Sequence, residues 1–392
     1  MVSTAVRNLH GHGRSTMTQK VRVAIAGLGF GAEFIPIYQA HPDAELAAVC
    51  QRTETALTQV ADHFGVPGRF TSFDAMLRDP GIDAVHINTP IPEHAEHTVA
   101  ALRAGKHVAC TVPMATTLDE CREIVAAVRE SGRNYMMMET VVYSREFLHV
   151  RDLVANGTIG RVQFLRGAHY QEMAGWPGYW EGLPPMHYAT HAVSPVLSLA
   201  GALAESVVCI GSGRISPRLA EKYGSPFAVE SALITLRGTP VGAEIARSLF
   251  ETAREYVESF TVFGSRASFE WEQTQGSGHV LHTGEEPKSI GIPDFGHRLP
   301  PQIAPFTTRG VYDDENEHLS FVQGGGHGGS HPHLAHEFIR SIVEERASAI
   351  DEVTAANWTS VGICAHASAM DGGARVAVPD YEELREQGSA AN

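Results

Sequence analysis

Short apolar runs alternate with amphipathic stretches over the first third of the chain. Each run has the length and the β-branched or aromatic content of a buried strand, and the stretches between them repeat their apolar positions at the helical period. This alternation predicts a parallel sheet with helices on both faces, which is a doubly wound α/β domain. The predicted strands are residues 20–26, 45–50, 84–88, 107–112 and 134–138, and the clearest helices are 32–40, 96–104 and 118–130.

The pattern changes beyond residue 143, where longer runs alternate apolar and polar residues as strands with one buried face do. We therefore expect a second, α+β domain built on a large, open, mostly antiparallel sheet. The alternating runs are 161–170, 231–238, 241–250 and 254–273, and the predicted division is a disordered leader at 1–18, a first domain at 19–142 and a second at 143–392.

Two later segments complete the predicted second domain. Residues 276–326 are rich in Gly, Pro and His without a clear period, and we interpret them as a long loop region that serves as a lid or an oligomer contact. Residues 351–367 have the apolar face of a packed helix, which makes Trp358 a predicted core residue.

Charge and composition exclude several classes of protein. The formal net charge of −15 over 392 residues argues against binding to nucleic acid or to an anionic membrane. The polar leader has no signal-peptide core, and no segment is long and apolar enough to span a bilayer. The five cysteines are scattered and never spaced C-x-x-C, so we expect neither disulfides nor a zinc site, and a reducing cytoplasm fits best.

The first predicted strand ends in a glycine turn. Gly27, Gly29 and Ala32 are spaced G-x-G-x-x-A between a strand and a helix, with Phe30 and Gly31 inside the motif. Glycines let the backbone approach a pyrophosphate, which then sits at the N-terminus of the following helix. The turn therefore predicts a dinucleotide-binding Rossmann domain.

The end of the second strand leaves the choice of cofactor open. An acidic residue normally grips the adenosine ribose there, whereas this chain has Gln51 followed by Arg52. The amide of Gln51 can bond a ribose hydroxyl, and Arg52 can bind a 2′-phosphate, stack on adenine or remain solvated. We favour NAD over NADP, which is not excluded.

The glycine turn together with residues 88–117, NTPIPEHAEHTVAALRAGKHVACTVPMATT, resembles the glucose-fructose oxidoreductase and inositol dehydrogenase superfamily (Gfo/Idh/MocA) over nearly the whole chain. The resemblance implies a Rossmann domain, an open-sheet domain, a tightly held nicotinamide cofactor and a sugar or polyol substrate. It also places Asn88, Thr89, Pro90 and His94 along the cofactor.

The chain departs from this family at Thr111, Val112 and Pro113, beside the expected cofactor. Dehydrogenases of the superfamily typically have Glu-Lys-Pro there and use the lysine at the reacting hydroxyl. An isopropyl group neither accepts a proton nor stabilises an alkoxide. Another residue must take that role, or none does.

His187 and His191 occupy the second family site, where dehydrogenases typically show Asp and His four residues apart. We expect one helix to present both imidazoles on one face, where a neutral imidazole can act as a general base. Packing at the domain interface is the alternative for each. No third ligand is evident near this pair, and we expect no metal site.

Several local strings narrow the resemblance to the NAD-dependent glycosidases of the superfamily, including the α-N-acetylgalactosaminidase type. In those enzymes NAD transiently oxidises the C3 hydroxyl, a base removes the C2 proton, the C1 group is eliminated, water adds and C3 is reduced again. The resemblance carries over His191, Glu139 and Tyr143. It aligns the catalytic tyrosine of those enzymes with His169 or with the next residue, Tyr170. Only one of the two can face the sugar, because neighbouring strand residues point to opposite faces.

Aromatic and histidine-rich loops supply further candidates. Trp176, Tyr179 and Trp180 can stack on a pyranose ring or simply anchor their loop. His327 is a candidate substrate contact, whereas Ser330 is interpreted as a helix N-cap. The histidines of this region and the following glutamate have a spacing like that of metal ligands, but we expect no metal site there. They are His327, His331, His333, His336 and Glu337.

Three functions therefore compete: a redox-assisted glycoside hydrolase with catalytic NAD, a net sugar or glycoside dehydrogenase, and a non-catalytic NAD-sensing protein. Arginines on the second domain could bind the anionic group of a substrate such as a sulfonated sugar, which makes a sulfoquinovosidase one candidate. For most of these arginines, however, we expect an ordinary surface position. We expect the chain to form a homo-oligomer, either a homodimer or a homotetramer. The arginines are Arg166, Arg214, Arg247 and Arg254.

Overall fold

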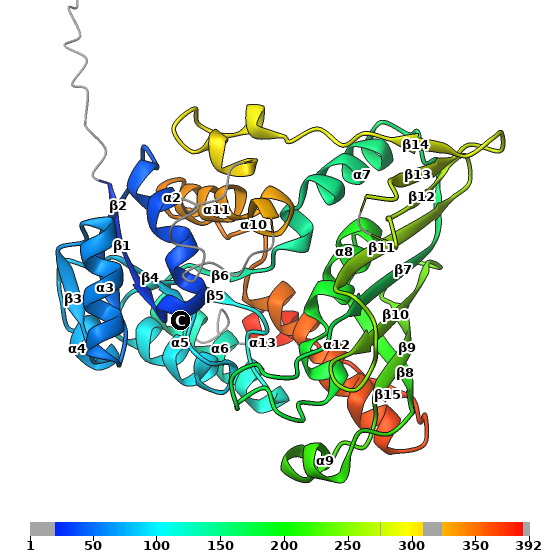
Figure 1. The fold of residues 1–392 in the computed structure, drawn as a ribbon, viewed down its shortest axis with the longest axis horizontal. Coiled ribbons are helices and arrows are strands. Elements are labelled where there is room, and N and C mark those ends of the chain that lie inside the picture. The colour runs from blue at the N-terminus through cyan, green and yellow to red at the C-terminus, as the bar shows by residue number, and fades with distance from the viewer. Residues whose placement is uncertain (1–19, 275, 309–323, 387–392) are drawn as a thin grey trace, which may run out of the picture.

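The computed structural model describes residues 20–274, 276–308 and 324–386. Two sheets lie side by side, a six-stranded one near the N-terminus and a nine-stranded one after it (Figure 1). The predicted leader lies outside the described residues. In the described part of the chain, no helix is long and apolar enough to cross a membrane.

The first sheet is entirely parallel, as the alternation of strands and helices predicted. Its strands are β1 (Val21–Ala26), β2 (Ala44–Cys50), β3 (Gly68–Phe70), β4 (Ala84–Ile87), β5 (His107–Thr111) and β6 (Tyr135–Met138). They lie in the order β3-β2-β1-β4-β5-β6 with parallel pairing throughout. This is the strand order of a dinucleotide-binding fold, in which the strands run outward in opposite directions from the point between β1 and β4.

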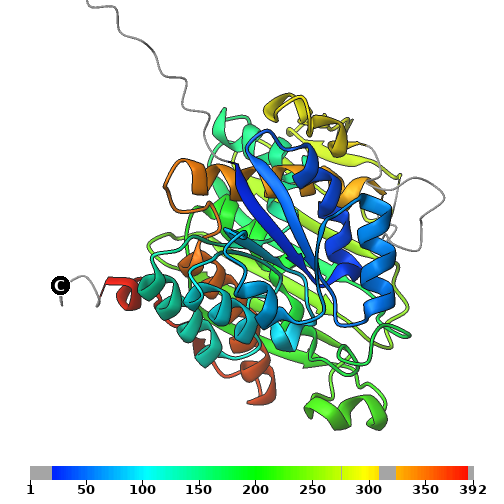
Figure 2. The ribbon, with the colours of Figure 1, turned by 90° about the vertical axis from the view of Figure 1, so that its left-hand side faces the viewer.

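Helices cover both faces of this sheet, which explains why its strands are apolar at consecutive positions. α2 and α3 lie on one side, and α5 and α6 lie on the other (Figure 2). The helices of this domain are α1 (Leu28–Gly31), η1 (Ala32–Phe34), α2 (Ile35–Ala40), α3 (Glu54–Phe64), α4 (Phe73–Leu77), η2 (Ile91–Glu93), α5 (His94–Arg103) and α6 (Leu118–Ser131).

The helix predicted at 32–40 is broken into short pieces that begin at Leu28. Pro36 lies in the first turn of α2 and has no N–H to donate to the carbonyl of Ala32. The chain therefore passes through the 3₁₀ turn η1 before the α-helix resumes. The sequence pattern located the helical segment but missed this interruption.

The second sheet is mostly antiparallel, as predicted, with one parallel pair at its centre. Its strands are β7 (Val162–Tyr170), β8 (Ala204–Ser212), β9 (Val229–Leu236), β10 (Gly242–Ser248), β11 (Val257–Gly264), β12 (Ser268–Glu270), β13 (His279–His282), β14 (Lys288–Ile290) and β15 (Val376–Ala377). Their order is β14-β13-β12-β11-β7-β10-β9-β8-β15, and only β7 and β10 pair in parallel.

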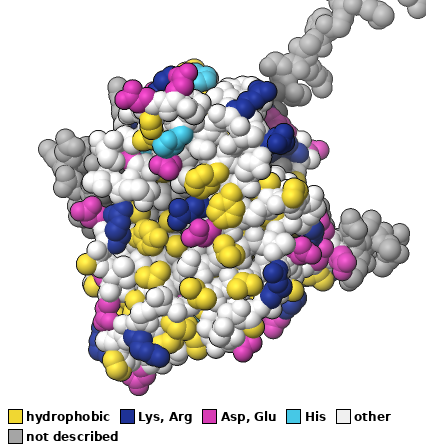
Figure 3. Space-filling model, turned by 90° about the vertical axis from the view of Figure 1, so that its right-hand side faces the viewer, with side chains coloured by type: hydrophobic (Ala, Val, Ile, Leu, Met, Phe, Trp, Pro, Cys, Tyr) yellow, Lys and Arg dark blue, Asp and Glu magenta, His cyan; other side chains and the backbone are white. Residues whose placement is uncertain are grey.

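Helices cover the inner face of this sheet, and its outer face is shown in Figure 3. Gly167 on β7 decides how closely the inner layer approaches, because a Cβ there would lie 2.0 Å from the carbonyl oxygen of Ala192 on α8. The remaining helices are η3 (Val141–Tyr143), α7 (Arg145–Ala155), η4 (Pro185–Tyr188), α8 (Thr190–Ala200), α9 (Pro217–Tyr223), η5 (Gly296–Arg298), η6 (Ala304–Thr307), α10 (Gly324–Gly329), α11 (His331–Val343), α12 (Glu352–Met370) and α13 (Glu382–Glu386).

The region predicted as one long loop at 276–326 contains regular structure. β13 and β14 form a hairpin at the edge of the second sheet, and the 3₁₀ turns η5 and η6 follow. These strands are too short to produce a readable alternation. Residues 309–323 lie outside the described residues, so the lid interpretation of that part stays a prediction.

Two further local predictions have different outcomes. Trp358 is a core residue, 4% exposed, on α12, which is buried on nearly all sides and not on one face alone. Ser330 immediately precedes α11, but its side chain makes no capping hydrogen bond, so the predicted cap is wrong in its chemistry. The five cysteines are all unpaired and buried.

Candidate active site

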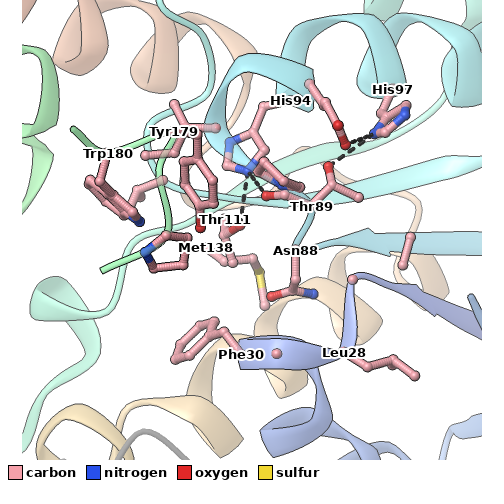
Figure 4. Close-up of a pocket in the computed structure, with 18 of the residues that line it drawn as sticks. Leu28, Phe30, Asn88, Thr89, His94, His97, Thr111, Met138, Tyr179 and Trp180 are labelled. Carbon is pink, nitrogen blue, oxygen red and sulfur yellow. Dashed lines mark hydrogen bonds and ion pairs between the residues drawn. The ribbon is translucent and has the colours of Figure 1, made fainter. Parts of the chain in front are cut away.

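A cavity of about 810 Å³ lies between the two sheets. The carboxyl ends of β1, β2, β4 and β5 form one wall, and residues of β7, α8 and the loop after β7 form the other. Ligands of open α/β sheets bind at this edge, where the strand order reverses. The cavity is therefore the candidate site for both cofactor and substrate (Figure 4).

The glycine turn forms the floor of the cavity. Gly27 has φ of +86°, and a Cβ there would lie 2.3 Å from the carbonyl oxygen of Asn88, so only glycine fits. A Cβ on Gly29 would meet no heavy atom within 4 Å, which leaves room for a phosphate against the backbone. Gly31 and Ala32 lie behind the cavity wall, since neither lines it.

The end of β2 holds the turn in place. The backbone N–H of Leu28 donates to Oε1 of Gln51 over 3.2 Å. Arg52 is 77% exposed and lies 3.2 Å from a carboxylate oxygen of Glu93. Because Glu93 already neutralises Arg52 and would repel a 2′-phosphate, this end of the cavity suits an unphosphorylated ribose better.

Hydrogen bonds connect the loop after β4 to neighbouring elements (Figure 4). His94 Nδ1 lies 2.8 Å from the carbonyl of Pro113, and its Nε2 lies 2.8 Å from the carbonyl of Thr89. Burial lowers the pKa of His94, so a neutral ring can donate to only one of these carbonyls at a time. Thr89 also contacts His97 over 2.9 Å. His94 thus ties the β4 loop to the segment after β5.

Two side chains of the same wall bear directly on a bound cofactor and substrate. Asn88 lines the cavity, and its Oδ1 is buried with no hydrogen-bond partner among the described residues, as expected of an atom that meets a ligand. Val112 also lines the cavity and is 8% exposed. The position of the family lysine therefore presents an isopropyl group to the cavity.

His191 faces the cavity from α8 and is oriented by Glu139 at the end of β6. Its Nδ1 lies 2.7 Å from Oε1 of Glu139, and both side chains are buried. Burial lowers the pKa of His191, but the carboxylates of Glu139 and Glu258 outweigh it and leave the pKa raised. Glu139 itself does not line the cavity, so its predicted contact with the cofactor is replaced by this contact with His191.

His187 does not join His191, and the predicted single helix is wrong. His187 belongs to the 3₁₀ turn η4, which starts at the proline pair Pro184 and Pro185, whereas His191 belongs to α8. The ring of His187 packs 5.1 Å from that of His366, away from the cavity, and burial lowers its pKa to about 4. Its predicted catalytic role therefore has no support in the geometry.

His169, and not Tyr170, faces the cavity from β7. His169 is 1% exposed, and neither ring nitrogen has a hydrogen-bond partner among the described residues. Burial lowers its pKa well below the ordinary value, with Arg247 adding to the effect. Tyr170 lies on the outer face in a second, smaller hollow beside Arg166 and Glu244, so its predicted catalytic role is wrong.

Two functional candidates on the neighbouring strand escaped the sequence analysis. Glu258 on β11 stands opposite His169, and its Oε1 lies 3.9 Å from His169 Nε2 and 3.7 Å from His191 Nε2. Tyr256, which lines the cavity, donates its hydroxyl to the same oxygen. A glutamate in a predicted strand was the available signal, but its partner depends on the strand register.

The aromatic loop lines the cavity as predicted. Trp176, Tyr179 and Trp180 are among its lining residues, and Trp180 packs edge-on against Tyr188 at 4.7 Å between ring centres. Tyr179 and Trp180 lie next to each other in Figure 4. His327 also lines the cavity. Tyr143, a predicted substrate contact, does not line the cavity.

The arginines that suggested an anionic sugar do not line the cavity in the described part of the chain. Arg247 is fully buried and donates to the carbonyls of His169, Tyr188 and Ser248 and to Gln171, so it fixes the wall behind the cavity. Arg166 pairs with Glu244 on the outer face.

The cavity thus gathers most, but not all, of the predicted site residues. Those that line it are Gly27, Gly29, Phe30, Gln51, Arg52, Asn88, Thr89, Pro90, His94, Thr111, Val112, His169, Trp176, Tyr179, Trp180, His191 and His327. Those that do not are Gly31, Ala32, Pro113, Glu139, Tyr143, Tyr170 and His187.

Comparisons with known proteins agree with this architecture. A family model described as an oxidoreductase family with an NAD-binding Rossmann fold matches residues 21–139. A glycosyl hydrolase family 109 protein of Shewanella baltica is 31% identical over 198 residues, which are 45% of this chain and 43% of that protein. One of Saccharopolyspora erythraea is 30% identical over 200 residues, covering 45% and 44%. The chain therefore spans less than half the length of these curated relatives.

Solved structures share the fold over almost the whole chain. A levoglucosan dehydrogenase in complex with NADH and levoglucosan has a TM-score of 0.75 at 20% identity and covers 92% of this chain and 100% of that one. An aldose-aldose oxidoreductase of Caulobacter crescentus has a TM-score of 0.71 at 19% identity, with coverage of 92% and 100%.

The glycine-bearing parallel sheet, the open second sheet and the cavity between them define a two-domain oxidoreductase architecture with an NAD-binding Rossmann domain. Residues 21–139 are thus similar to the NAD-binding domain of the Gfo/Idh/MocA oxidoreductases.

Proposed function

We propose that this chain is an NAD-dependent enzyme that acts on a sugar or glycoside by hydride transfer at a ring hydroxyl, with C3 as the predicted position. Its proposed net reaction is redox-assisted glycoside hydrolysis. NAD supplies a hydride acceptor that returns the hydride at the end of the cycle, so none is consumed. The glycosyl hydrolase family 109 relatives support this proposal.

The pairing of His191 with His169 carries the proposal. Removal of a hydride from a secondary alcohol needs one group to handle the hydroxyl proton, whereas elimination needs a second group at the neighbouring carbon. The two rings lie 5.1 Å apart between centroids and both line the cavity, while Val112 leaves the lysine position apolar. Net dehydrogenation requires only the first of these two groups.

The shape of the cavity supports a sugar as the substrate. Trp176, Tyr179 and Trp180 line it with aromatic rings, against which the C–H faces of a pyranose can stack. Because no arginine other than Arg52 lines the cavity in the described residues, a neutral sugar fits better than a sulfonated one. This weighs against the sulfoquinovosidase candidate.

A net sugar dehydrogenase is the second candidate, because enzymes named as sugar oxidoreductases share the fold. The two are separated by incubating the protein with α- and β-linked nitrophenyl glycosides and a trace of NAD, while aglycone release and NADH absorbance are followed together. Many aglycones per NAD without net NADH are expected. NADH formed one-for-one with a ketosugar would replace the proposal with the dehydrogenase, and NAD binding without any turnover would leave the non-catalytic NAD-sensing protein.

His191→Ala tests the site itself. It should abolish aglycone release while NADH fluorescence still reports cofactor binding, because His191 lies on the substrate side of the cavity. His187→Gln, four residues earlier and outside the cavity, is the matched control and should retain turnover. Full activity in His191→Ala would overturn the assignment.

A further inference from the structure

Three buried side chains meet beside the cavity in an arrangement that the proposed acid-base roles do not explain. His169, His191 and Glu258 each bring one potential ligand atom to within 4.8 Å of the others. They come from three elements: β7, α8 and β11. The register of β7 with β11 sets His169 opposite Glu258, and Gly167 lets α8 approach closely enough to add His191.

The two histidines of this cluster are arranged as metal-binding histidines are. His191 contacts Glu139 through Nδ1, which fixes the proton there and leaves the lone pair of Nε2 directed at the cluster. Metal-binding histidines almost always donate their other ring nitrogen to a carboxylate or carbonyl in this way. His169 has no hydrogen-bond partner at either nitrogen among the described residues, an expensive state for a buried imidazole.

The buried guanidinium beside the cluster is engaged by other groups. Glu139 and Glu258 are two carboxylates, and Arg247 is the cation beside them, but its N–H groups donate to backbone carbonyls and to the amide of Gln171. In the described part of the chain, Arg247 therefore makes no ion pair with Glu258. Buried carboxylates are commonly paired or coordinate a metal, so Glu258, beside two imidazoles, can serve as a metal ligand.

We propose that His169, His191 and Glu258 bind a divalent transition-metal ion, with zinc as the first candidate. Two imidazoles and one carboxylate with an open side are a ligand set of catalytic zinc sites. Zinc bonds of about 2.0–2.2 Å place ligand atoms roughly 3.4 Å apart, so the observed 3.7 and 3.9 Å close with small side-chain rotations.

The open side of the ion would face the cavity, which His169 and His191 line. A cation there replaces the positive charge that the lysine supplies in other family members and that Val112 cannot supply. The Tyr188 hydroxyl, now 3.2 Å from His191 Nε2, would turn from that nitrogen, while Tyr256 can keep its bond to the carboxylate. In the ion-bound protein His169 and His191 would be ligands and would not transfer protons themselves, so the open side of the ion would act at the reacting hydroxyl in their place. This consequence for catalysis rests on the proposed function, but the binding of the ion does not.

The test begins with metal content and needs no substrate. The full chain is stripped with a chelator, loaded with excess zinc or cobalt, desalted and measured by plasma mass spectrometry. About one ion per chain is expected, and the cobalt form should show the visible absorption of a low-coordinate site. His169→Gln and Glu258→Gln should each lower retention at least tenfold.

His282→Gln is the matched control, because His282 also lies near a glutamate, 3.3 Å from Glu270, but without a second histidine. It should retain the ion. Circular dichroism and NADH binding verify that each variant is folded. Retention in the wild type no greater than in the folded His169→Gln variant would overturn the proposal and leave a protonated His191 as the missing cation.

Turnover of glycosides by the stripped protein separates this inference from the proposed function. Loss of aglycone release on stripping, with recovery on adding zinc, supports both. Undiminished release from metal-free protein would refute a role of the ion in catalysis while the redox-assisted hydrolysis stands, and ion retention alone would then decide the site. A bound ion without any turnover would support the site and refute the function.

Discussion

Nδ1 of His191 lies 2.7 Å from Oε1 of Glu139, across 52 residues of sequence. This contact joins the end of the last strand of the parallel sheet to the first turn of the helix that lies on the second sheet. The carboxylate does not line the cavity, so it acts on a cavity ligand through the imidazole. It is a positioning residue for His191.

Glu139→Gln should therefore impair turnover while sparing cofactor binding. The amide keeps the shape but loses the charge, so it no longer holds the proton at Nδ1 or sustains the electron density of Nε2. We expect a loss in kcat of about 10–100-fold with NADH affinity within about twofold. Steady-state kinetics and NADH fluorescence measure the two. Glu244→Gln, on the outer face, is the control, and equal losses in both variants would refute the positioning role.

The two glycines of the cofactor turn should respond differently to alanine. Gly27→Ala places a methyl group against the carbonyl of Asn88 at positive φ, so we expect the free energy of unfolding to fall by about 2–4 kcal/mol. Gly29→Ala meets nothing in the protein and should fold normally, but its methyl group occupies space needed by the pyrophosphate. Urea unfolding and NADH titration separate the effects; normal NADH affinity in Gly29→Ala would contradict this placement of the cofactor.

These examples show what the sequence could and could not predict. The glycine turn was predicted because all its determinants lie within a few residues. On β7 the period of two was evident, but which of His169 and Tyr170 faces inward depends on the packing of α8. Glu258 joins the site only through strand register, which no local pattern reveals. The pairing of His187 with His191 failed because a 3₁₀ turn interrupts the expected helix.

Val112→Lys should not improve glycoside cleavage. Val112 lies at the cavity wall, and an ammonium group there would add positive charge beside a wall that already presents His191 and His169 to the substrate. Aglycone release per enzyme is the measurement, with Val112→Met as an apolar control of comparable length. Faster cleavage by the lysine variant alone would mean that the wild-type wall lacks a group at the reacting hydroxyl.

Stability should fall in acid because of buried neutral histidines such as His86. Burial lowers the pKa of His86 to about 3, and the neighbouring His331 adds to the effect. The ring of His86 contacts Phe34 and the hydroxyl of Tyr38. Between pH 6.5 and that value the unfolded chain binds a proton that the folded protein does not, so lowering the pH favours unfolding by up to about 1.4 kcal/mol per pH unit.

His86→Gln removes this titrating group and should flatten the dependence of the unfolding free energy on pH. Urea unfolding at pH 6.5 and 4.5 measures the slope for both proteins, provided that unfolding is two-state. His63→Gln, on the exposed side of α3, is the control and should leave the slope unchanged. An identical slope in all three proteins would show that His86 is not kept neutral by the fold.

The outer face of the second sheet should pair two copies of the chain. Ile210 on β8 and Leu233 on β9 are 61% and 58% exposed there, and Figure 3 shows further hydrophobic side chains over the same face. An apolar sheet face of this kind marks an interaction surface. Light scattering at micromolar concentration should give at least twice the chain mass, and Leu233→Asp should reduce it to one chain. Met370→Asp, an exposed apolar residue at the end of α12, should not; a monomeric wild type would contradict the prediction.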